Sequence, residues 1–159
     1  PFSGVGNGWP FNGSGIRGRY FETRTTLSRS VGVVETPVLL DLRIHAPIAG
    51  TIDITPNRVP NKIVVGKPYT VYVALLGGPS FDVNRVVRGT ERFGGTGYEA
   101  VPVRPGALTD INRDGVADLL YGFRTVDCGW HAGDTRGVFR ADFGGGVVVE
   151  AYDPVLIVP

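Results

Sequence analysis

The sequence predicts an all-β fold: an antiparallel β-sandwich of the immunoglobulin-like, Greek-key type that carries an N-terminal extended arm. Twenty-four glycines and 12 prolines interrupt nearly every window long enough for an amphipathic helix. The intervals between them are rich in Val, Thr, Tyr and Phe, which favour short strands. A chain of 159 residues suits one domain, or one domain with an ordered extension.

Residues 1–30 are predicted to form the arm and residues 31–159 the sandwich. The arm is rich in glycine yet carries large aromatic residues, which a solvated disordered tail usually avoids. Residues 19–27 also alternate like a strand. We expect the arm either to pair with a neighbouring subunit and promote self-association, or to fold back as an edge strand. Asn12 begins an Asn-Gly-Ser triplet that fits an N-glycosylation site.

Strands are expected wherever apolar and polar residues alternate between turn signals. In residues 38–44 Val38, Leu40, Leu42 and Ile44 fall on one face, the period-two pattern of a half-buried strand. Further strands are predicted over residues 51–54, 62–65, 69–76, 81–87, 98–103, 117–123, 136–143, 147–152 and 155–158. The three glycines at 144–146 are expected to form the turn of a hairpin. Regular spacing of this kind is typical of a sandwich.

One motif points to a cation. Side-chain oxygens fall at positions 1, 3, 5 and 9 of a loop, Gly115 holds position 6, and position 7 offers a backbone carbonyl. The predicted Ca²⁺ ligands are Asp110, Asn112, Asp114, the Val116 carbonyl and Asp118. The alternative is an acidic surface turn, because Asp, Asn and Gly favour turns in any case. Position 12 is Tyr121 rather than Glu and a strand follows, so the loop is not an EF-hand.

With these residues the chain resembles a family of secreted bacterial and archaeal β-sandwich modules with a DxNxDGxxD calcium loop. Members run in the order IDIKPGS, PN-I, IPVAIL, FDV, RFG, DVNGDG--DLVLHF-T and GDT. The corresponding stretches here are residues 52–57, 60–63, 69–76, 81–83, 92–94, 110–125 and 133–135, within about 51–158. The resemblance implies a calcium-stiffened structural or adhesive part of a secreted, cell-surface protein, with no known catalysis.

The sequence gives less support for a functional role of the remaining candidate residues. Asp134 belongs to the GDT stretch and either reaches the ion or caps the turn at Gly133. Cys128 and His131 lie three residues apart, but a zinc site would need two more ligands and only His45 remains among the histidines. Cys128 is therefore expected to pack as a small apolar residue. No nucleophile–base pair is evident, so we predict that the protein is not an enzyme.

Charge and composition limit the classes of partner that the chain could bind. A net charge of +1 with scattered basic residues speaks against nucleic-acid binding, and no apolar run could insert into a membrane. The absence of Met and the start at Pro1 indicate a processed, secreted chain. The one dense aromatic group lies at residues 9–21, within the arm. This placement favours a self-associating subunit of a surface layer, matrix or filament over the alternative, a carbohydrate-binding or adhesion module.

Overall fold

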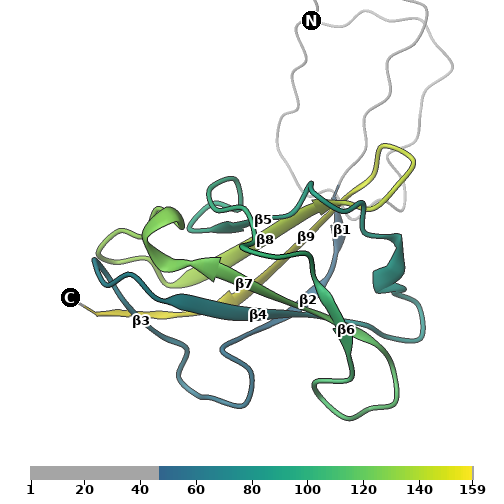
Figure 1. Ribbon diagram of the computed structural model, residues 1–159, viewed down its shortest axis with the longest axis horizontal. Helices are drawn as coiled ribbons and strands as arrows, with labels where there is room; N and C mark the ends of the chain where they lie inside the picture. The colour runs from purple at the N-terminus through teal and green to yellow at the C-terminus, as the bar shows by residue number, and fades with distance from the viewer. Residues whose placement is uncertain (1–46, 159) are drawn as a thin grey trace, which may run out of the picture. The chain divides into compact units, whose positions relative to one another are not determined.

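The computed structural model describes residues 47–158, which form two four-stranded sheets packed face to face (Figure 1). The predicted all-β sandwich is confirmed. Backbone contacts divide the chain into residues 1–46 and 47–159. The expected arm, the 38–44 strand, His45 and the Asn12 triplet lie outside the described residues. Within the part that is described, no helix is long and apolar enough to cross a membrane.

The strands are short and their order is not sequential. The first sheet has the order β1 (Ile48–Ala49), β9 (Val148–Pro154), β8 (Arg136–Asp142) and β5 (Arg92–Gly94). The second has the order β2 (Thr51–Ile54), β4 (Thr70–Leu76), β7 (Asp118–Arg124) and β6 (Ala107–Thr109). A separate pair joins β3 (Lys62–Val64) to β10 (Leu156–Val158). Pairing is antiparallel in both large sheets except between β1 and β9; β3 and β10 are also parallel.

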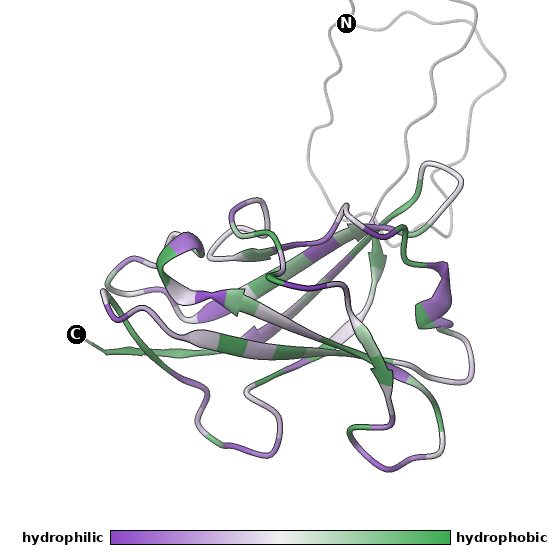
Figure 2. Ribbon diagram, viewed as in Figure 1, coloured by the Kyte–Doolittle hydropathy of each residue, from purple (hydrophilic) through white to green (hydrophobic). Residues whose placement is uncertain are grey.

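The core lies between the two sheets and is rich in aromatic rings. Along β4 the buried side chains Val71, Val73 and Leu75 alternate with residues on the outer face, so hydrophobic and hydrophilic positions alternate along the strands in Figure 2. Across the interface the Phe93 and Phe123 ring centroids are 5.1 Å apart. Burial of this apolar surface, at roughly 25 cal/mol per Å², is the main force that holds the sheets together.

Two predicted strands are wrong. Residues 81–87 instead contain a short 3₁₀ helix, η1 (Val83–Arg85), because the Asp82 carboxylate accepts a hydrogen bond from the Asn84 backbone N–H at 2.9 Å. Residues 98–103 form only isolated bridges, Ala100 with Phe93 and Pro102 with Phe123. Proline lacks the N–H that a continuous ladder would need at position 102.

The turn at 144–146 is confirmed, since it joins β8 to β9 and its three glycines have φ of 78°, 63° and 77°. Strands β1, β5 and β6 were not predicted. All three residues of β6 are exposed, so its sequence carries no apolar alternation that could reveal a strand. A second 3₁₀ helix, η2 (Thr125–Asp127), follows β7.

Candidate metal centre

The candidate calcium loop is the connection between β6 and β7. Asp110 follows the last residue of β6, and Asp118 is the first residue of β7. Thr109 and Asp118 are paired across the two antiparallel strands, so the ladder fixes both ends of the loop. The motif therefore lies in the tip of a hairpin, where donors from alternate residues can be brought close together.

The side-chain oxygens of the first three predicted ligands accept hydrogen bonds from three consecutive backbone amides, those of residues 114–116. The two carboxylate oxygens of Asp110 accept hydrogen bonds from the N–H groups of Asp114 and Gly115, at 3.1 and 3.0 Å. The Asn112 side-chain oxygen also accepts from the Asp114 N–H, at 3.1 Å. Asp114 in turn accepts from the Val116 N–H at 2.8 Å. These bonds turn the three side chains toward the interior of the loop.

Two left-handed residues allow the loop to turn so tightly. Gly115 has φ of +84°, the conformation predicted for the sixth position. Arg113 has φ of +61°, which is uncommon for a residue other than glycine. The alternation of ordinary and left-handed residues directs successive N–H groups to one side, where the oxygens of Asp110 and Asp114 meet them.

Asp118 is fully buried, with an exposed fraction of 0%. Its Oδ1 accepts a hydrogen bond from the Gly77 backbone N–H at 2.8 Å, and its Oδ2 accepts from the Ile111 N–H at 2.7 Å. These bonds tie the start of the loop to the connection that follows β4. An ionised carboxylate has about four acceptor sites, so two remain for a cation after both amides are bound.

The donor set fits a hard cation. Asp110, Asn112, Asp114 and the Val116 carbonyl offer only oxygen, the donor that Ca²⁺ prefers, whereas structural zinc sites are built mainly from Cys sulfur and His nitrogen. Within residues 47–158 no three His, Cys, Asp or Glu side chains cluster as a metal site. The loop interior accordingly has two carboxylates and one amide, and an ion with six to eight oxygens would complete its shell with water.

Asp134 makes the turn contact predicted as one of its two alternatives. Its carboxylate accepts from the His131 N–H at 2.8 Å, and its own N–H donates to the His131 carbonyl at 3.2 Å. Gly133 within this turn has φ of +95°. Asp134 lies beside Gly95.

Cys128 is buried, as expected for a small packed residue. Its thiol donates to the Arg124 carbonyl at 3.3 Å. Burial, with smaller contributions from the Asp127 and Glu99 carboxylates, raises the pKa of the thiol to about 12. A thiol with so high a pKa is a poor nucleophile and a poor metal ligand at neutral pH.

No protein family, curated protein or solved structure matches the chain. The resemblance to secreted calcium-loop modules therefore stays a prediction.

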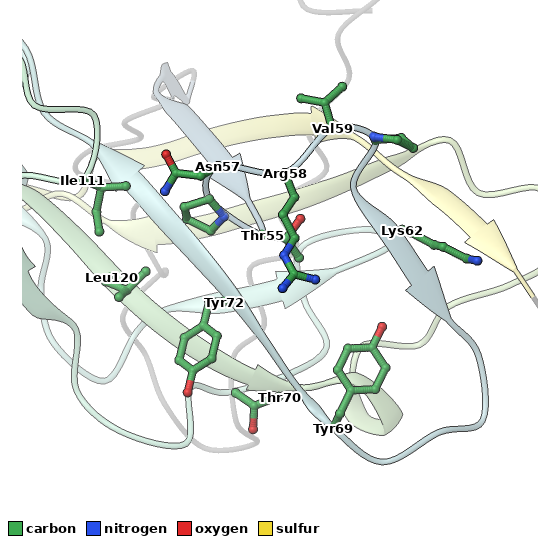
Figure 3. Close-up of a pocket in the computed structure, with 12 residues that line it drawn as sticks. Thr55, Asn57, Arg58, Val59, Lys62, Tyr69, Thr70, Tyr72, Ile111 and Leu120 are labelled. Carbon is green, nitrogen blue, oxygen red and sulfur yellow. The ribbon is translucent and has the colours of Figure 1, made fainter.

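A second feature was missed from the sequence. A groove of about 820 Å³, here called the Tyr72 groove, opens beneath the 55–60 loop on the outer face of the second sheet (Figure 3). It is lined by Thr55, Pro56, Asn57, Arg58, Val59, Pro60, Lys62, Tyr69, Thr70, Tyr72, Ile111 and Leu120. The one available signal was Tyr72 itself, an aromatic residue at a polar-face position of an alternating strand.

Proposed function

We propose that the protein is a calcium-stabilised structural module of an extracellular, cell-surface assembly. In this proposal the sandwich is the repeating body, and the arm of residues 1–30 joins copies into a layer, matrix or filament. The module has no catalytic role of its own.

The observation that carries the proposal is the convergence of Asp110, Asn112 and Asp114 on one side of a loop of nine residues. Asp110 and Asn112 both accept from the Asp114 N–H, Asp110 also accepts from Gly115, and Asp114 accepts from Val116; both aspartates are exposed to solvent. Two like-charged carboxylates in one short loop repel each other by Coulomb's law, and a divalent cation bound between them would offset that cost. A plain surface turn needs no such concentration of negative charge.

Calcium, when bound, would supply the positive charge that cross-links these donors. Asp110, Asn112, Asp114 and the Val116 carbonyl would hold the ion. The predicted fifth ligand, Asp118, does not cluster with the other two aspartates, and its two carboxylate oxygens hold backbone amides at the base of the loop instead. Because Asp118 binds Gly77, a filled loop would brace the β6–β7 hairpin against the end of β4. Ions that bind only the folded state stabilise it, which suits a protein that must persist outside the cell.

The side chains considered for catalysis support a structural role. Cys128 is buried and its pKa is raised, the reverse of what an activated nucleophile requires. His131 is exposed, and its backbone N–H is bonded to Asp134. Neither side chain is arranged as a nucleophile paired with a base.

Thermal melting with and without calcium tests the metal site. At a calcium concentration about a hundred times the dissociation constant, the folded state should gain about 2.7 kcal/mol relative to chelator. Asp114→Ala should abolish most of this gain. The matched control is Asp142→Ala, at an exposed aspartate at the end of β8, which should leave it intact. Equal melting temperatures in calcium and chelator would refute the metal site.

Light scattering after size-exclusion chromatography tests the assembly role. The full chain should form oligomers that a deletion of residues 1–30 converts to a folded, calcium-responsive monomer. A full chain that is monomeric at every concentration, with or without calcium, would contradict self-association. Oligomers that survive the deletion would show that other surfaces join the copies.

A further inference from the structure

The Tyr72 groove presents two tyrosine rings. Tyr72 is 55% exposed and pairs with Gly122 on the neighbouring strand. A β-carbon at Gly122 would lie 2.9 Å from the Thr70 methyl carbon and 3.5 Å from the Tyr72 ring. The glycine therefore allows Thr70 and Tyr72 to lie close to the sheet. Tyr69 is half-buried, and its phenol oxygen accepts from the Val64 N–H at 3.0 Å, which fixes the second ring.

The groove also carries positive charge without an acidic partner. Arg58 and Lys62 are both exposed, and no Asp or Glu lines the groove. Among the described residues, neither cation lies within 4.0 Å of a carboxylate oxygen, the separation that defines the ion pairs of Arg124 and Arg140. Figure 3 shows the Arg58 side chain reaching from the loop toward the space between the rings of Tyr72 and Tyr69.

The 55–60 loop that carries Arg58 is held in a strained conformation. Thr55 and Asn57 have φ of +50° and +68°, which is rare for residues other than glycine and rarest for a β-branched one. The strain is maintained by hydrogen bonds: the Thr55 N–H donates to the Tyr72 carbonyl at 2.8 Å, and its hydroxyl donates to Asn61 at 2.9 Å. Strained residues held by their surroundings concentrate at ligand-binding loops.

These features select a class of ligand. Within the described residues Arg58 and Lys62 form no ion pair, and no acid lines the groove itself, which favours an anion; Asp53 and Asp153 line a neighbouring hollow that Arg58 also borders. The exposed ring of Tyr72 favours a ligand ring with an apolar side. The Thr70 hydroxyl and the Asn57 amide can hydrogen-bond to hydroxyl groups. A nucleic acid would need a broader basic surface than two cations. The volume of about 820 Å³ falls within the range of small-ligand sites, from roughly 300 to 1,000 Å³.

We propose that the Tyr72 groove binds an acidic polysaccharide, one that contains uronate or sulfate groups. A sugar ring lies against Tyr72, its anionic group pairs with Arg58, and Lys62 attracts the next anionic group along the polymer. This role is additional to the proposed structural one. The module would thus hold both copies of itself and the surrounding anionic matrix.

Calorimetry with two hexasaccharides tests the proposal. Hyaluronan hexasaccharide carries uronates that alternate with N-acetylglucosamine, whereas chitohexaose is neutral and contains N-acetylglucosamine alone. Titrations are run in low-salt buffer with chelator, so that the result does not depend on the calcium site. We expect the acidic saccharide to bind at least about tenfold more tightly than the neutral one, as the loss of a charged hydrogen bond implies. Equal affinities, or no binding of either at millimolar concentration, would overturn the proposal.

Variants locate the binding. Arg58→Gln and Tyr72→Ala should each weaken hyaluronan binding about tenfold or more, and Lys62→Gln should weaken it less. The controls are Arg136→Gln and Tyr98→Ala, exposed residues of the same types outside the groove. Circular dichroism melts confirm that each variant folds. Binding that depends on Arg58 but not on Tyr72 would show an anion site without a sugar platform and would overturn the saccharide assignment. Binding that the controls weaken equally would place the ligand elsewhere.

Discussion

The Asp118 carboxylate accepts a hydrogen bond from the backbone N–H of Gly77 at 2.8 Å, across 41 positions of sequence. The contact joins the connection after β4 to the first residue of β7. A β-carbon at position 77 would lie 2.2 Å from the Ala117 carbonyl oxygen, so only glycine allows this approach. The second oxygen of Asp118 binds the Ile111 N–H, and the residue therefore closes the base of the candidate metal loop from inside.

Asp118→Ala should lower the free energy of unfolding by about 3 kcal/mol in chelator, because it leaves two backbone N–H groups without a partner near a buried position. Asp118→Asn should cost less, since its amide oxygen can still accept one of the two bonds. Urea unfolding monitored by fluorescence measures both values. Asp142→Ala, at an exposed position, should change the stability by less than about 0.5 kcal/mol. A loss below about 1 kcal/mol for Asp118→Ala would show that water replaces the carboxylate.

Stability in acid should depend on Glu99. Partial burial opposes ionisation of this side chain, but hydrogen bonds from the Thr96 hydroxyl and the Tyr98 and Thr96 N–H groups outweigh it and lower the pKa. A carboxyl whose pKa is lowered on folding stabilises the protein above its ordinary value, 4.5 for Glu, and this contribution is lost as the pH falls through the folded pKa.

Glu99→Gln should therefore make the melting temperature less sensitive to pH below about 4.5. Melts at several pH values between neutrality and strong acid give the comparison. The same slope in acid for the variant and the parent would mean that other carboxyls carry the dependence. Asp142→Asn serves as the control, because its carboxylate makes no hydrogen bond within the described residues.

Cys128 should react slowly with thiol reagents in the folded protein. Its exposed fraction is 0% and burial raises its pKa to about 12, so the reactive thiolate is both inaccessible and scarce at pH 8. The rate of reaction with Ellman's reagent should rise steeply across the urea transition. Rapid stoichiometric labelling without denaturant would show that the β7–β8 connection opens readily.

The fold was predictable where one face of a strand is buried. The alternation of Val71 and Val73 with Tyr72 predicted β4 within one residue, and the strand over 51–54 was predicted with its observed bounds. A strand was wrongly predicted over residues 81–87 because their apolar residues resemble the buried face of a strand. Val83 and Val86 are indeed buried, but the backbone turns between them in a 3₁₀ helix. Burial there follows local hydrogen bonds rather than strand periodicity.

The two candidate sites also differ in how far each could be predicted from the sequence. The metal loop is local, so its donors could be read from nine consecutive residues. The Tyr72 groove is lined by Arg58 from one loop, Tyr72 from a strand and Ile111 from another loop. Arg58 and Ile111 are far apart in the sequence. No short motif encodes such a site; it exists only once β2, β4 and β7 have paired.

Ile111 belongs to both candidate sites. Ile111 lies in the sequence between the proposed ligands Asp110 and Asn112. It also lines the Tyr72 groove, near Leu120. A bound ion that restricts the loop should therefore also restrict one wall of the groove. Asp118 holds the Ile111 N–H at 2.7 Å and so restricts the same segment, and the coupling should therefore be modest.

We expect calcium to strengthen hyaluronan hexasaccharide binding by about fivefold, the lower end of typical coupling between sites. By thermodynamic reciprocity the saccharide must strengthen calcium binding by the same factor. Calorimetric titration of each ligand in the absence and presence of the other measures both factors. Magnesium controls for a simple effect of ionic charge. Ile111→Ala should remove the coupling while calcium binding alone persists. If calcium left the saccharide affinity unchanged in the parent protein, Asp118 by itself would be sufficient to fix the shared wall.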